Sequence, residues 1–231
     1  MRLDRFMSHA IGVSRAEARR EIRKGRVMLD GQAVRDPASH VQDKVQVTWR
    51  GEELTLPGAR YLMLHKPPGL VCATRDPAQA TVLSLLPPAM PADLHIVGRL
   101  DRDTTGLLLL TTDGGWTHRI ISPRTDCLKV YRARLVKRPD EAALALLREG
   151  LLLRGETRPT RPAEVVQCGE HEVRIGIREG RYHQVRRMFA AVGNRVLDLH
   201  RESIGGLVLD PALNPGEWRE LRPGEVEQVF E

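Results

Sequence analysis

Hydrophobic positions near the start of the chain follow a helical period. The apolar stripe consists of Leu3, Phe6, Met7 and Ala10. Recurrence every three to four residues places these side chains on one face, which predicts a short amphipathic helix. Gly12 follows directly, and because glycine often ends a helix, we expect this helix to end there.

A second helix is predicted immediately afterwards. Ser14 and Glu17 have the spacing of a capping box, in which each side chain hydrogen-bonds the other residue's backbone amide. Ala18 and Ile22 form the expected buried side of this helix, and Gly25 is its expected end.

A hairpin and a linker complete the amino-terminal region. Two short apolar runs, 26–29 and 32–34, flank Asp30-Gly31, which is a strong signal for a two-residue hairpin turn. Residues 35–60 contain prolines and glycines among short polar runs, and they indicate the last strands of the module plus a linker. We therefore expect a small, basic α/β module over residues 1–58.

Short apolar runs dominate the rest of the chain. The expected strands are 61–64, 107–111, 131–136, 173–177 and 195–199. They alternate with two segments of helical spacing, 139–148 and 184–192. Strands interspersed with a few helices indicate an α+β domain, which we place at residues 59–231.

Positive charge is concentrated at the amino-terminal end. The chain has 36 basic and 30 acidic residues, and residues 1–50 hold eleven and six of them, hence five of the six net charges. Arg15, Arg19 and Arg23 recur every four residues on the second predicted helix, where like charges repel by about 0.2–0.5 kcal/mol per pair. Such a face favours an opposing anion, and RNA is a polyanion that basic patches bind well. The alternative is a solvated helix surface.

Cysteine usage and hydropathy exclude several classes. Cys72, Cys127 and Cys168 are odd in number, far apart and without Cys-x-x-Cys spacing, so neither a disulfide framework nor a zinc site is indicated. The histidines also lack metal-ligand spacing, and we expect no metal and no cofactor. The start of the chain lacks a signal peptide, and no segment approaches the roughly 20 apolar residues of a membrane span. We expect a cytoplasmic protein without a membrane partner.

The candidate chemistry lies in the polar, glycine-flanked segment 98–106. Four leucines, 107–110, follow it and predict a strand that is buried on both faces, so the segment is a loop on a rigid support. Asp101 at the mouth of this strand is the candidate catalytic carboxylate, with a turn or capping role as its alternative. Asp103 is a rival, because two carboxylates could form an acid–base pair. Asp113, at the far end of the strand, is expected to order backbone amides.

Four segments in this order and spacing resemble the motifs of pseudouridine synthases, enzymes that convert uridine into its carbon-linked isomer within folded RNA. They are residues 61–67, 98–114, 129–131 and 179–189. Residues 1–58 resemble a small RNA-binding module that is named after a ribosomal small-subunit protein. The resemblance implies a mixed, largely antiparallel sheet in the second domain. It also implies a reaction in which uracil detaches, turns over and reattaches within a closed pocket, without a cofactor.

The resemblance also implies roles for individual residues. Asp101 matches the family's invariant acid, which either attacks the sugar or takes its proton. Tyr131 matches the active-site tyrosine that packs against the target base. Arg186 matches the cation that keeps the acid ionised, and Arg187 is the alternative for that role. The expected substrate-binding residues are Arg99, which fills the vacated space or contacts a phosphate, and Arg187, Lys66, Arg15, Arg19 and Arg23. His65 stands where the family usually has asparagine.

The end of the chain favours one branch of the family. Residues 179–194 and 199–202 resemble the branch that modifies small-subunit 16S ribosomal RNA, and Tyr182-His183 stands where large-subunit members typically have asparagine-arginine. We expect a monomer that acts on ribosomal RNA or on a small-subunit assembly intermediate. The alternatives are a large-subunit 23S RNA synthase, a non-catalytic ribosome-assembly protein, and a nucleoside or glycoside hydrolase.

Overall fold

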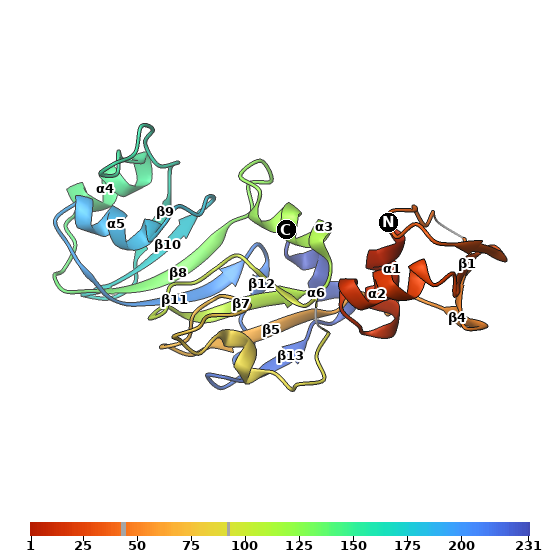
Figure 1. Cartoon of the computed structure of the whole chain (residues 1–231). Coiled ribbons are helices and arrows are strands. Elements are labelled where there is room, and N and C mark those ends of the chain that lie inside the picture. Colours follow the sequence, from red (N-terminus) through yellow and green to blue (C-terminus); the bar gives the residue numbers. More distant parts are fainter. Residues whose placement is uncertain (43–44, 92) are drawn as a thin grey trace. The chain divides into compact units, whose positions relative to one another are not determined.

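The chain is described by a computed structural model that covers residues 1–42, 45–91 and 93–231 (Figure 1). It divides into two compact units. The first consists of Met1–Ala59 and Ala89–Leu94, and the second of Arg60–Pro88 and His95–Glu231. The sequence placed a boundary at residues 58 and 59 but gave no sign that the short segment 89–94 groups with the first unit.

Two helices and four short strands form the first unit. The helices are α1 (Leu3–Ile11) and α2 (Arg15–Arg23), and the strands are β1 (Val27–Leu29), β2 (Gln32–Val34), β3 (Val47–Trp49) and β4 (Glu52–Leu54). The strands form an antiparallel sheet in the order β2-β1-β3-β4. Leu3, Met7, Ala18 and Ile22 pack in one core with Val27 and Val47, so the predicted apolar faces of both helices are confirmed.

Local signals in this unit act as predicted. Gly12 ends α1 with φ +68°, a left-handed conformation that glycine adopts at little cost. Ser14 and Glu17 form both hydrogen bonds of the capping box at the start of α2. Asp30 and Gly31 both have positive φ, as the turn of a two-residue hairpin requires, and β1 pairs with β2 across them.

The anion that faces the arginine stripe is internal. Asp4 of α1 is fully buried and accepts hydrogen bonds from Arg2 (3.2 Å), Arg15 (2.8 Å) and Arg19 (2.9 Å). Burial by itself raises the pKa of Asp4, but the three guanidinium groups outweigh it and hold this pKa well below its usual range. Arg15 and Arg19 remain nearly half exposed, and Arg23 is exposed, so the stripe also faces solvent.

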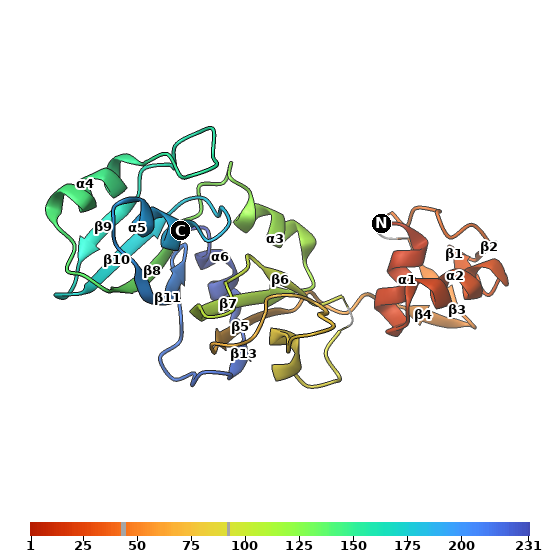
Figure 2. The same ribbon diagram turned by 60° about the vertical axis from the view of Figure 1, so that its left-hand side comes forward.

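A nine-stranded sheet organises the described part of the second unit (Figure 2). Its path is β13-β5-β7-β11-β8-β10-β9, with β12 paired to β11 and β6 to β7. The bounds are β5 (Tyr61–Lys66), β6 (His95–Val97), β7 (Thr105–Thr111), β8 (Lys129–Leu135), β9 (Glu164–Gln167), β10 (Glu172–Ile177), β11 (Val196–Ile204), β12 (Leu207–Val208) and β13 (Trp218–Glu220). The pair β7–β11 is parallel and the other pairs are antiparallel, so the expected mixed, largely antiparallel sheet is confirmed.

The described helices of the second unit are α3 (Gly114–Ile121), α4 (Glu141–Glu149), α5 (Gln184–Ala191) and α6 (Pro223–Gln228), with a 3₁₀ turn, η1 (Val82–Leu85). Helix α3 contacts β6, α4 contacts β9 and α5 contacts β11 (Figures 1 and 2). The segments of helical spacing correctly predict α4 and α5, whereas α3 and α6 are additions. Asp113 accepts hydrogen bonds from the amides of Gly115 and Trp116 at the start of α3, so its expected amide-ordering role is confirmed. None of the described helices is both long and apolar enough to cross a bilayer.

Strand β7 passes through the centre of the second unit. Leu107 to Leu110 are all fully buried, which confirms the prediction of a strand covered on both faces. Leu107 and Leu109 pack against Trp116 and Ile120 of α3. The loop that precedes β7, which carries Asp101, is thus attached to a fully buried strand.

Gly106 allows β7 and β11 to approach closely. It pairs with Arg201, has φ +103°, and a Cβ atom added to it would lie 2.2 Å from the Arg201 carbonyl oxygen. A side chain at this position would therefore separate the two strands that border the Asp101 loop.

We expect G106A to lower the free energy of unfolding by at least about 3 kcal/mol, because backbone atoms cannot move aside as a flexible side chain can. G114A is the matched control, since nothing lies within 4 Å of a Cβ atom there and its φ is ordinary. Urea unfolding of both variants checks this, and equal stability of the two would contradict it.

The Asp4 cluster predicts an acid-sensitive amino-terminal unit. The pKa of Asp4 is lower in the folded chain than its unfolded value of about 3.9. The contribution of Asp4 to the free energy of unfolding is therefore complete above about pH 5 and is lost as the pH falls from there toward the folded pKa. We expect D4N to lower local stability by about 2 kcal/mol at pH 7 and to flatten this pH dependence. Hydrogen exchange of the α1 and α2 amides in the full chain measures both effects. A D4N profile that falls with acid as steeply as the wild-type profile would refute the assignment.

Candidate active site

The Lys66 side chain hydrogen-bonds the loop between β6 and β7. The Lys66 ammonium is fully buried and donates to the carbonyl oxygens of Pro67 (3.0 Å), Arg102 (2.9 Å) and Thr104 (2.9 Å). Burial lowers the pKa of Lys66, and the nearby acidic groups, Asp101 among them, act in the opposite direction. All three donors are thus taken by the chain itself. In place of the expected substrate contact, we assign Lys66 the support of the Asp101 loop.

Asp101 faces two potential cations from helix α5 and the turn before it. Its Oδ1 lies 3.4 Å from Nε2 of His183, and its Oδ2 lies 3.8 Å from Nε of Arg186. Its side chain is 31% exposed, so it remains accessible from solvent. The structure therefore brings together two residues that the sequence paired, Asp101 and Arg186, and adds His183, which sequence reasoning assigned no role in the chemistry.

Arg187 points to a different partner. Its Nη1 donates to Oε1 of Glu156 at 2.9 Å and to the carbonyl of Tyr182, and its Nη2 donates to the carbonyl of Arg154. Periodicity left Arg186 and Arg187 equivalent, because both lie off the buried face of α5. The geometry separates them, since only Arg186 is paired with Asp101.

Tyr131 and Arg201 occupy neighbouring strands opposite the Asp101 loop. They are cross-strand partners in β8 and β11, and both are buried. Arg201 donates to the Tyr131 hydroxyl (3.4 Å) and to the carbonyls of Leu107 (2.8 Å) and Gly98 (3.4 Å). Within the described ranges it forms no ion pair with a carboxylate. Its charge is therefore held by neutral oxygens, and it stays available to anything negative in the space in front of it.

That space is a cavity of about 530 Å³. Its wall includes Arg99, Asp101, Lys129, Tyr131, Tyr182 and Arg201. A second cavity of about 80 Å³ also borders Asp101 and Tyr131, and Thr104 lines it. The larger volume is within the range of cavities that bind small molecules, so it is sufficient for a nucleoside.

Three polar residues of the segment 99–104 differ in their surroundings. Arg99 is exposed, lines both cavities and forms no hydrogen bond or ion pair within the described residues, so its guanidinium is available. The Thr104 hydroxyl is buried and, among the described side chains, is without a hydrogen-bond partner. Asp103 is exposed and lines neither cavity, so the geometry favours Asp101 over this rival.

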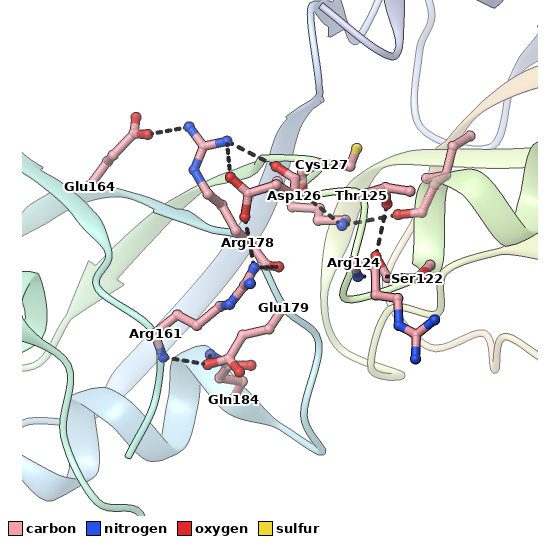
Figure 3. Close-up of polar contacts among 12 residues, drawn as sticks. Ser122, Arg124, Thr125, Asp126, Cys127, Arg161, Glu164, Arg178, Glu179 and Gln184 are labelled. Atoms are coloured by element: carbon pink, nitrogen blue, oxygen red, sulfur yellow. Dashed lines mark hydrogen bonds and ion pairs between the residues drawn. The ribbon is translucent and has the colours of Figure 1, made fainter. Parts of the chain in front are cut away.

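Ionic contacts fix the segments that flank the larger cavity (Figure 3). Asp126 accepts from Arg161 (2.7 Å) and Arg178 (3.4 Å), which joins the loop before β8 to the end of β10. Oε1 of Glu179 accepts from the Arg161 amide (3.0 Å) and from the Gln184 side chain (2.7 Å). These contacts hold the turn that leads into α5.

His65 lies away from Asp101. It borders a separate cavity of about 580 Å³ that contains none of the candidate catalytic residues, and its Nδ1 lies 2.8 Å from the Leu213 carbonyl. The departure from asparagine at this position therefore leaves the lining of the Asp101 cavity unchanged. In the described part of the chain, no three His, Cys, Asp or Glu side chains are placed to hold a metal ion.

Comparison with known proteins decides the family. Residues 60–191 match the model of RNA pseudouridylate synthase, and residues 1–47 match that of the S4 domain. The chain belongs to the RNA pseudouridylate synthase family. It is 46% identical over 231 residues to ribosomal small subunit pseudouridine synthase A of Vibrio cholerae, which covers all of both chains. It is 48% identical over 230 residues to the protein of that name from Escherichia coli, which covers 99% of this chain and 100% of the relative.

A solved structure supports the same placement. A crystal structure of a pseudouridylate synthase is 42% identical, aligns with a TM-score of 0.73, and covers 99% of both chains. The expectations of an isomerase and of this fold class are thus confirmed. Arg201 and His183 are the site residues that sequence reasoning missed. Both lie in segments that carried the resemblance, 179–194 and 199–202, but their contacts with Tyr131 and Asp101 follow from the fold.

Removal of the Lys66 ammonium should loosen the Asp101 loop. K66M removes one donor from each of the Pro67, Arg102 and Thr104 carbonyl groups, of which Arg102 still accepts from the Gly69 amide, and we expect local stability to fall by about 2 kcal/mol. Exchange of the Gly69 and Thr104 amides, which donate to carbonyls of this loop, should then accelerate by about 30-fold. K137M, at an exposed position, is the control. Unchanged exchange of both amides in K66M would show that the loop does not need this tether.

Proposed function

We propose that this protein isomerises a specific uridine of small-subunit 16S ribosomal RNA to pseudouridine. The observation that carries the proposal is the cavity in which Asp101, paired with Arg186 and His183, faces Tyr131 and Arg201. The small-subunit target is supported by full-length similarity to relatives named ribosomal small subunit pseudouridine synthase A. We also propose a cytoplasmic monomer that acts on ribosomal RNA or on a small-subunit assembly intermediate.

The reaction requires rearrangement of one bond. The bond between uracil N1 and ribose C1′ breaks, a bond between C5 and C1′ forms, and the proton lost from C5 is balanced by one gained at N1. No oxidant or reductant is therefore involved. The target nucleotide must first leave its stack, because its ribose and base edge are otherwise inaccessible to a side chain.

Each cavity residue has a proposed role in these steps. Asp101 acts on the ribose, either by attack on the sugar or by removal of a sugar proton, and Arg186 pairs with it at 3.8 Å. Tyr131 packs against the base. Arg201 faces the oxygens of the detached ring, which carries negative charge until it reattaches. Arg99 has an exposed guanidinium, unpaired among the described residues, that suits the target phosphate or the space that the base has left.

The amino-terminal module is proposed to bind RNA through its arginine face. Arg15 and Arg19 are nearly half exposed even though they bind Asp4, and Arg23 is exposed. Asp4 therefore orients two of these guanidinium groups without enclosing them. A row of oriented cations at four-residue spacing suits contacts with phosphates along one strand of RNA.

The decisive variant is D101N, which keeps the shape of the side chain but removes its charge. We expect pseudouridine formation in 16S ribosomal RNA to fall by at least about 1,000-fold, while the affinity for that RNA stays within about threefold. D103N is the matched control and should retain activity. Chemical mapping of pseudouridine in ribosomal RNA from cells that lack the gene, complemented with each variant, gives the answer.

The alternatives give different maps. A modified uridine that depends on the gene but lies in 23S RNA would transfer the activity to the large subunit. Identical maps with and without the gene, combined with salt-sensitive RNA binding, would favour a non-catalytic assembly protein. Release of free base or sugar from RNA would indicate a hydrolase.

A further inference from the structure

Tyr182 is an exposed aromatic residue at the wall of the Asp101 cavity. Its side chain is 73% exposed, whereas the other two tyrosines of the chain, Tyr61 and Tyr131, are half-buried and buried. An exposed ring forgoes the stabilisation that burial provides, but single exposed hydrophobic residues are common on protein surfaces and do not by themselves mark a site. The contact of Tyr182 with His183 is the second observation.

Tyr182 is stacked on His183. The two ring centroids are 3.8 Å apart and the ring planes differ by 18°. His183 in turn places Nε2 3.4 Å from Oδ1 of Asp101. One face of Tyr182 is therefore covered by a ring that contacts the catalytic carboxylate, and both residues line the same cavity of about 530 Å³.

The backbone of this pair is strained and held in place. His183 has φ +47°, a conformation that costs a residue with a side chain of the order of 1 kcal/mol. The turn is fixed by Glu179, which accepts from the Arg161 amide and from Gln184 (Figure 3). The Tyr182 carbonyl accepts from Arg187 at 3.1 Å. The rings are thus presented by a rigid segment.

The charges at the cavity wall suit a nucleic acid chain. Arg99, Arg102, Lys129, Arg181 and Arg201 line it, against Asp76, Asp101 and Glu179. Arg181 is anchored by the carbonyls of Arg158 and Pro159 and is paired with Glu156 and Glu179. The cations at the wall that have no carboxylate partner among the described residues are therefore Arg99, Arg102, Lys129 and Arg201. A phosphate backbone can therefore pass over this rim while a base contacts the ring.

We propose that Tyr182, backed by His183, is a stacking platform for an unpaired nucleobase that directly neighbours the target uridine. This inference rests on the proposed function, because it takes Asp101 to act at the ribose of that uridine. The two rings are separated by 3.8 Å, close to the spacing of about 3.4 Å between successive bases. The stack that begins beside Asp101 continues outward through Tyr182, and the neighbouring base forms the next layer once the target base has left its own stack.

The platform compensates for base stacking that is lost when the target uridine leaves the RNA stack. An everted uridine leaves its neighbour without a stacking partner, and a rigid tyrosine replaces that partner at little entropic cost. Stacking accepts any base, so this contact adds affinity and position, whereas the sequence of the site is read elsewhere. Tyr182 is a binding residue in this scheme, and His183 connects the platform to the catalytic carboxylate.

The test compares Y182L with Y182F on a 16S-derived RNA fragment that the wild-type protein modifies. Leucine keeps an apolar side chain without a ring, and phenylalanine keeps the ring without the hydroxyl. We expect Y182L to raise both Kd and KM by about 5- to 100-fold, and Y182F to rescue both to within about threefold. V166A, which trims a 61% exposed side chain of β9 outside both cavities, should leave them unchanged.

A fluorescent base locates the stacked nucleotide. With 2-aminopurine beside the target uridine, binding should quench fluorescence in the wild-type protein and in Y182F but not in Y182L. An abasic nucleotide at that position should weaken wild-type binding by a factor similar to that of Y182L and should add nothing to the Y182L defect.

The outcomes separate the two proposals. Suppose that the wild-type protein modifies the fragment, and that Y182L equals it in RNA affinity and in quenching of 2-aminopurine. The platform is then refuted and the proposed function stands. If the wild-type protein forms no pseudouridine in ribosomal RNA at all, the proposed function fails, and with it the platform. Circular dichroism melting verifies that Y182L is folded, which an exposed position leads us to expect.

Discussion

The candidate active site depends on a buried ammonium group that binds three backbone carbonyl oxygens. Lys66, at the end of β5, reaches the loop before β7 and satisfies its three donors on Pro67, Arg102 and Thr104. A buried ammonium is costly unless each of its hydrogens is bonded, so few arrangements of the loop are compatible with it. The observed arrangement of the loop holds Asp101 at the wall of the cavity. A catalytic carboxylate has to be held in place in this way.

A second constraint is the close pairing of β7 with β11. The absence of a side chain at Gly106 lets the strands meet, and this contact brings Arg201 beneath Gly98 and beside Tyr131. The carboxylate and the buried guanidinium are thus positioned by different devices, a side-chain tether and a backbone contact. Both devices act on the same short loop, so the geometry of the site is over-determined.

Much of this arrangement is encoded locally and could be predicted. The capping box at Ser14, the Asp30-Gly31 turn and the four buried leucines each depend on neighbours within a few residues. The motif around Asp101 also predicted the carboxylate that lines the cavity. Helix α3 was missed because its sequence opens with two glycines, whose helix propensity is low, although Asp113 caps it and Trp116 is buried.

The contacts that escaped prediction are those between distant segments. The resemblance paired Arg186 with Asp101 and kept the adjacent Arg187 as the alternative, and only the fold shows that Arg187 meets Glu156 instead. Side chains of β11 alternate between the two faces of the sheet, so the register of β11 with β8 decides that Arg201 lies beside Tyr131. Asp4 lies in a sequence with the pattern of an amphipathic helix, and its three arginine partners depend on how α1 packs on α2. The charge pattern predicted an external anion for the arginine stripe, whereas Asp4 already binds two of its three arginines.

The long separation of these contacts along the chain affects when the protein becomes competent. Arg201 lies 103 residues after Gly98, 94 after Leu107 and 70 after Tyr131. A nascent chain emerges from the amino terminus, so the strands and helices before residue 60 leave the ribosome long before β11 exists. Synthesis therefore delivers the S4 domain early and completes the Asp101 cavity only near the end of translation. Fragments released prematurely would contain the S4 domain without a complete Asp101 cavity.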